Sequence, residues 1–181
     1  MLIYFNVLII MQIFLRPIEE KDGPSIVRWR NDPSVLSHCL DKTRITEESN
    51  LAFYKANVLS GKYKQFIVEC LDEVTGVCTY PIATVYLKDM DYGNKRCELC
   101  IFTSSDVEWK PDSQSLAIEK LTEMAFNEYG MHKVYSYVFS KFPDEVELLT
   151  KAGFTIEATL NGEAMAENGV FEDIVRLMRI K

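Results

Sequence analysis

Two cysteines three residues apart are the residues that most suggest metal or redox chemistry. Cys97 and Cys100 form a C-x-x-C pair inside the apolar run RCELCIF, which is typical of a β-strand. Side chains on a strand alternate between its faces, so these two sulfurs point in opposite directions and cannot share one ligand. The only histidines, His38 and His132, are not spaced to complete a tetrahedral site. We therefore expect no metal. The odd total of five cysteines indicates a reducing compartment rather than a disulfide framework.

The net negative charge of the chain limits which kinds of molecule it is expected to bind. The chain of 181 residues carries a net charge of −7, and no block of Lys or Arg interrupts it. Proteins that bind nucleic acid present a basic face, so we expect no nucleic-acid partner. An acidic protein fits a cationic partner such as an amine. The composition, 48% hydrophobic and 26% charged, is that of a globular protein of one domain.

The amino-terminal fifteen residues are almost wholly apolar and end at Arg16 and Pro17. A membrane span needs about 20 such residues, and a signal peptide has a basic start and a small-residue cleavage site, which are absent. Three readings stay open: an extra buried strand, a natural start at Met11, and a lipid-inserting segment. We take residues 1–10 as an extension and residues 11–181 as a single domain, and we expect a cytoplasmic protein without a membrane span.

The hydrophobic periodicity predicts strands and helices in a mixed order. Short β-branched and aromatic runs predict strands, and apolar residues at helical spacing between Pro and Gly signals predict helices. The strand predictions are 12–17, 64–73, 81–91, 96–103, 133–140, 154–160 and 170–180. The helix predictions are 19–32, stopped before Pro33, and 46–61, 115–130 and 143–153. This order predicts an α/β sheet with helices on both faces.

The residues in these elements resemble the GNAT acyl-CoA N-acyltransferases. The matching pieces run from about residue 13 to residue 181: LRPIEEKD and WRNDP near the start, ELCIFTSSDVEW, LTEMAFNEYGMHKVYSYVFS, LLTKAGF, and NGVFEDIVRLMRIK at the end. The resemblance is greatest to the ribosomal-protein N-terminal acetyltransferase branch. It implies a mixed, mostly antiparallel sheet and acetyl-CoA as the acyl donor. The acceptor would be a small-molecule or peptide amine, and the protein a monomer or homodimer.

The resemblance also implies where the cofactor lies. The fourth and fifth strands of this fold splay apart, and the pantetheine arm of the cofactor lies between them. In this chain those strands are residues 98–103 and 133–140, so the expected cofactor contacts include Ile101, Phe102, Thr103 and Ser140.

The loop that holds the CoA pyrophosphate departs from the family pattern. The family motif, Q/R-x-x-G-x-G/A, aligns with residues 109–114, WKPDSQ, and neither glycine is present. Pro111 has no N–H to donate, and Asp112 brings a carboxylate to the expected phosphate position, where it can instead cap the helix. Lys110 is the counterweight, because its ammonium can pair with a phosphate. The expected cofactor contacts in this region are Lys110, Asp112, Ser113, Gln114 and Ser115.

Three further positions bear on catalysis. Glu98 stands where many relatives place a glutamate that takes a proton from the amine, while a glutamate paired with Arg96 or Lys95 is the alternative. Phe142 and Leu149 align with an Asn that helps to hold CoA and a Tyr that protonates the leaving thiolate. Neither replacement can do that work.

Three hypotheses follow. The first is an active N-acyltransferase with Glu98 as base and a weakened cofactor grip. The second is a degenerate relative that keeps the fold as a binding or assembly module. The third is a transferase whose acyl donor lacks the CoA nucleotide. The sequence favours the first and does not identify the amine.

Overall fold

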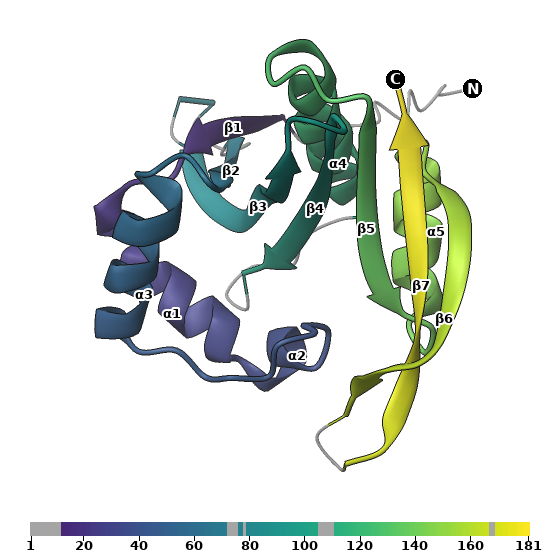
Figure 1. The fold of residues 1–181 in the computed structure, drawn as a ribbon. Helices are drawn as coiled ribbons and strands as arrows, with labels where there is room; N and C mark the ends of the chain where they lie inside the picture. The colour runs from purple at the N-terminus through teal and green to yellow at the C-terminus, as the bar shows by residue number, and fades with distance from the viewer. Residues whose placement is uncertain (1–11, 72–75, 78, 105–110, 167–168) are drawn as a thin grey trace, which may run out of the picture.

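The structure, a computed structural model, describes residues 12–71, 76–77, 79–104, 111–166 and 169–181. These form one seven-stranded sheet in the order β1-β2-β3-β4-β5-β7-β6 (Figure 1). Its strands are β1 (Ile13–Pro17), β2 (Lys64–Leu71), β3 (Thr79–Asp91), β4 (Arg96–Thr103), β5 (Lys133–Phe139), β6 (Thr155–Met165) and β7 (Phe171–Ile180). All neighbours pair antiparallel except β4 and β5, which run parallel. The predicted fold class, a mixed and mostly antiparallel α/β sheet, is confirmed.

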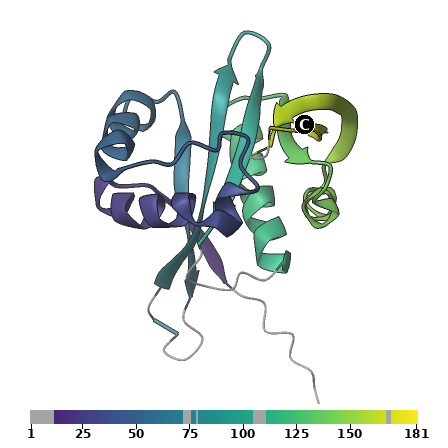
Figure 2. The ribbon, with the colours of Figure 1, turned by 90° about the horizontal axis from the view of Figure 1, so that it is seen from below.

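Helices cover both faces of this sheet (Figures 1 and 2). α4 (Pro111–Asn127) and α5 (Pro143–Lys151) pack on one face, against a core that includes Leu99, Ile118 and Leu121. α1 (Gly23–Asn31), α2 (Pro33–Leu36) and α3 (Glu47–Phe53) lie on the other side. Trp29 of α1 is 1% exposed and packs in a smaller apolar cluster with Ile26 and Ile67. The remaining elements are two short helical turns, η1 (Glu20–Asp22) and η2 (Tyr54–Val58).

Helix α2 is a difference from the sequence prediction. Pro33 was expected to stop the first helix, and α1 does end at Asn31. Asp32 then adopts an extended backbone and accepts a hydrogen bond from the Ser34 N–H at 2.8 Å. Proline suits the first position of a helix, since its missing N–H would have no helical partner there. Pro33 therefore ends one helix and begins the next.

The parallel pair β4–β5 is short and then separates. Ladder partners are Arg96 with Lys133, Cys97 with Val134 and Glu98 with Tyr135, after which the pairing stops. Beyond Tyr135, β5 continues pairing with β7 on its other edge as far as Phe139. The predicted separation of the fourth and fifth strands is thus present, and Glu98 lies at the point where the gap begins.

Among the helices of the described residues, none combines the length and apolar character that crossing a bilayer requires.

Candidate active site

A cavity with a volume of about 410 Å³ lies between β4 and β5. One wall is the continuous stretch 98–103 of β4, and the other is residues 136–138 of β5. On the face of the sheet that α4 and α5 cover, the cavity is lined by Gln114 and Ile118 of α4 and by Leu148 and Leu149 of α5. Arg30 of α1 and residues of α2 and the loop after it line it from the opposite side, so the cleft is reached by helices from both faces.

Successive side chains of β4 point to opposite faces of the sheet, and this decides which of them reach the cleft. Cys97 and Leu99 are fully buried in the core beneath α4, whereas Glu98 and Cys100 face the other side of the sheet. Cys100 lines the cleft and Cys97 does not. The two sulfurs of the C-x-x-C pair therefore lie on opposite faces, as strand geometry predicts.

Glu98 is 5% exposed and has two polar partners among the described residues. The Lys88 ammonium lies 3.1 Å from its Oε1, and the Cys100 thiol donates to the same oxygen at 3.1 Å. Burial acts to lower the pKa of Lys88, but the neighbouring Cys100 and Glu98 raise it above its usual value. Burial and then the charge of Glu98 raise the pKa of the Cys100 thiol well above its usual range, so this thiol stays protonated.

The opposite side of the cleft carries a second pair. His38, two residues past α2, contacts the Glu145 carboxylate of α5 through Nδ1 at 2.6 Å. Its ring also stacks on Phe142, with centroids 3.8 Å apart. Phe142, which was expected at the family's asparagine position, thus packs against the imidazole of His38. His38 and Glu145 both line the cavity.

The predicted site residues divide into those near the cleft and those away from it. Glu98, Ile101, Phe102, Thr103 and Gln114 line the cavity, and the structure brings them together with Leu149. Ser113 is buried and Ser115 half-buried in α4, without lining the cavity. Ser140 is exposed just past β5, where its N–H donates to the Asp173 carbonyl at 2.9 Å. Lys110 and the side chain of Asp112 lie outside the described residues, although α4 does begin at Pro111.

Sequence reasoning missed Lys88, Cys100, His38 and Glu145. Lys88 is the cross-strand partner of Glu98. Opposite charges on two predicted neighbouring strands were a usable signal for this pair, but only with the register known. No sequence signal joins His38 to Glu145, since 107 positions separate them.

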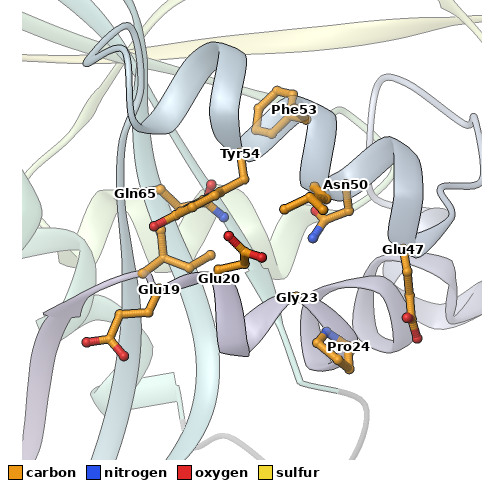
Figure 3. Close-up of a pocket in the computed structure, with 11 residues that line it drawn as sticks. Glu19, Glu20, Gly23, Pro24, Glu47, Asn50, Phe53, Tyr54 and Gln65 are labelled. Carbon is orange, nitrogen blue, oxygen red and sulfur yellow. The ribbon is translucent and has the colours of Figure 1, made fainter.

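A smaller cavity of about 180 Å³ lies elsewhere, between α1, α3 and the end of β1. Figure 3 shows Glu20, Tyr54 and Gln65 gathered around it, with Pro24 and Glu47 at its side. It contains no residue of β4 or β5, so it is separate from the splayed strands. The cleft is the candidate active site.

Comparison with known proteins agrees with this architecture. Residues 12–155 match the family described as "Acetyltransferase (GNAT) domain". The chain therefore belongs to the GNAT acetyltransferase family, whose acyl donor is acetyl-CoA.

Individual relatives act on polyamines. The chain is 23% identical over 166 residues to a spermidine N(1)-acetyltransferase of Vibrio cholerae, covering 92% of this chain and 91% of that protein. A crystal structure of spermidine N-acetyltransferase from Vibrio cholerae in complex with CoA and spermine superposes with a TM-score of 0.84. It is 22% identical and covers 93% of this chain and 95% of that one. A chimera of the same enzyme gives a TM-score of 0.77, also at 22% identity, with coverages of 93% and 95%. At this level of identity the structures establish the fold, and the ribosomal-protein branch is not singled out.

Proposed function

We propose that this chain transfers an acetyl group from acetyl-CoA to a primary amine in the cleft between β4 and β5, with Glu98 as the base. The observation that carries the proposal is the position of Glu98 at the fork of the two strands, buried and lining the cavity. The contacts of Glu98 with Lys88 and Cys100 are made through Oε1. In this proposal the carboxylate accepts a proton from the amine, directly or through water.

The reaction balances without a cofactor other than the donor. The amine nitrogen attacks the thioester carbonyl, the C–N bond forms and the C–S bond breaks. The amine proton passes to Glu98, and CoA leaves as a thiolate. Leu149 has no proton to give, so water protonates the thiolate in this account. A thiolate is a tolerable leaving group, and the step is slowed rather than blocked.

The charges of the cleft favour an acceptor with more than one amine. Asp41, Glu98 and Glu145 line the cavity together with Arg30 and Lys88. Hydrogen bonds from the Thr43 backbone and hydroxyl lower the pKa of Asp41, so its carboxylate is charged. Lys88 pairs with Glu98 and Arg30 acts on Asp41, so three carboxylates of this lining face two cations, and the negative excess suits a cationic chain. We infer a polyamine such as spermidine as the acceptor, the substrate in the name of the Vibrio cholerae relative.

The grip on acetyl-CoA is proposed to be weaker than the family norm. The motif positions 109–114 lack both glycines, and Pro111, the first residue of α4, cannot donate an N–H to a phosphate. The contacts offered by the strands remain, since residues 101–103 and Gln114 line the cleft.

The test is an acetylation assay with the purified protein and acetyl-CoA. Spermidine, spermine and a peptide with a free N-terminal alanine, the acceptor type of the ribosomal-protein branch, are supplied separately, and products are read by mass spectrometry. We expect one acetyl group added to the polyamines. Saturable acetyl-CoA binding without product on any amine would favour the degenerate module. Failure to bind acetyl-CoA at millimolar levels would favour a donor without the nucleotide.

A further inference from the structure

Lys88 is placed where it can organise the proposed base. It lies on β3 opposite Glu98 of β4, and a bulge near Asp89, whose φ is +50°, sets this register. The Glu98 side chain is 7% exposed and that of Lys88 is 25% exposed, so the pair is largely screened from water. Both residues line the cleft.

A second donor fixes the same carboxylate oxygen. The Cys100 thiol donates to Glu98 Oε1, and Cys100 is itself hydrogen-bonded to the Tyr86 side chain. The protein therefore directs two donors to Oε1. Two donors on one oxygen fix the orientation of a carboxylate that lines the cavity.

We propose that Lys88 is a positioning residue for the acetyl transfer. It anchors Oε1 of Glu98 and so fixes the orientation of the carboxylate toward the amine. This inference rests on the proposed function, because it assigns a role relative to the base of that reaction. Lys88 does not touch the reacting atoms in this account and acts through Glu98.

The neighbourhood of Glu98 identifies Lys88 as its counter-ion. The titratable groups that face Glu98 come from every element around it: Tyr63 before β2, Tyr86 and Lys88 of β3, Cys100 of β4 and Tyr135 of β5. Arg30 of α1 and Asp41 also line the cleft. Of these, Lys88 is the cation in direct contact, at 3.1 Å.

The test compares Lys88→Met with Lys88→Arg in the full chain. With spermidine and acetyl-CoA, we expect Lys88→Met to lower kcat about tenfold or more while KM for acetyl-CoA stays unchanged. Lys88→Arg keeps a cation opposite Glu98 and should retain most of the wild-type kcat. Lys62→Met, at an exposed position, is the control for loss of a surface lysine.

A stability cycle separates this inference from the proposed function. The free energy of unfolding is measured for Lys88→Met, Glu98→Gln and the double variant, which needs no activity. We expect the two effects to be clearly non-additive. Additive effects, or a Lys88→Met enzyme with wild-type kcat, overturn the role of Lys88 and leave the acetyltransferase proposal standing. A coupled pair in a wild-type protein that acetylates none of the amines overturns the proposed function instead.

Discussion

The two walls of the cleft are equipped differently. The β4 wall presents a buried carboxylate with two donors on one oxygen, Lys88 and Cys100. The α5 wall presents Leu149, which is 4% exposed and has no proton to donate. In the proposed mechanism the β4 wall therefore supplies the base, and Leu149 supplies no acid for the leaving thiolate.

The largest expected effect is on the β4 wall. Glu98→Gln keeps the shape of the residue but cannot accept the amine proton, and kcat should fall by about 10²- to 10⁴-fold. Binding of acetyl-CoA, measured by calorimetry, should change little. Glu163→Gln on the exposed β6–β7 hairpin is the matched control. A Glu98→Gln enzyme with wild-type kcat would remove the base from the account.

The next effect concerns neither wall but the start of α4. Asp112→Gly removes a carboxylate whose repulsion of a phosphate at about 4 Å is on the order of 1 to 4 kcal/mol. We expect the Kd for acetyl-CoA to fall by roughly tenfold or more, as read by a thermal-shift or calorimetric titration. Asp112→Asn separates loss of charge from loss of the side chain. Unchanged or weaker binding in both variants would disprove this interpretation of the loop.

A tyrosine on the α5 wall should reduce the difference between the walls. Leu149→Tyr supplies a proton donor, and we expect kcat to rise by about tenfold, the lower part of what a general acid contributes. Because the position is buried, added bulk costs about 1 to 3 kcal/mol of stability. Leu149→Phe adds the bulk without the hydroxyl and is the control. Equal rates in the two variants would mean that departure of the thiolate does not limit turnover.

The smallest effect is expected from the contact between His38 and Glu145. His38→Ala removes the contact with Glu145 and the stack on Phe142. Exposed pairs of this kind contribute about 0.2 to 1 kcal/mol, so the melting temperature should fall only slightly. KM for spermidine should rise by roughly two- to threefold, because the cleft loses part of its wall. A large loss of kcat in steady-state assays would instead give His38 a direct part in the chemistry.

The strands and helices were easier to predict from the sequence than the side-chain contacts between them. The β4 and β5 segments were found because both are short runs of β-branched and aromatic residues, and α4 because of its helical stripe. The resemblance to the family supplied the splayed strands and Glu98. Helix α2 was missed because Pro33 was taken as a stop, whereas with Asp32 as its cap it starts a new helix.

The Lys88–Glu98 pair shows why the rest could not be found. Arg96 pairs with Asp91 across the turn at residues 92–95, and an unbroken ladder from there would set Lys88 opposite Leu99. The bulge between Lys88 and Asp91 shifts the register by one residue, which brings the lysine opposite Glu98 instead. Nothing in the local sequence fixes such a bulge, because Asp89 reaches its positive φ without a glycine. The register is decided by packing.

Hydrogen–deuterium exchange with and without acetyl-CoA shows where the donor binds and requires no turnover. If acetyl-CoA binds between β4 and β5, it slows exchange at residues 99–103 of β4 and 136–138 of β5, which line the cleft, and leaves the β6–β7 hairpin unchanged. Protection around the smaller cavity between α1 and α3, or no protection of β4 and β5 at saturating acetyl-CoA, would contradict it.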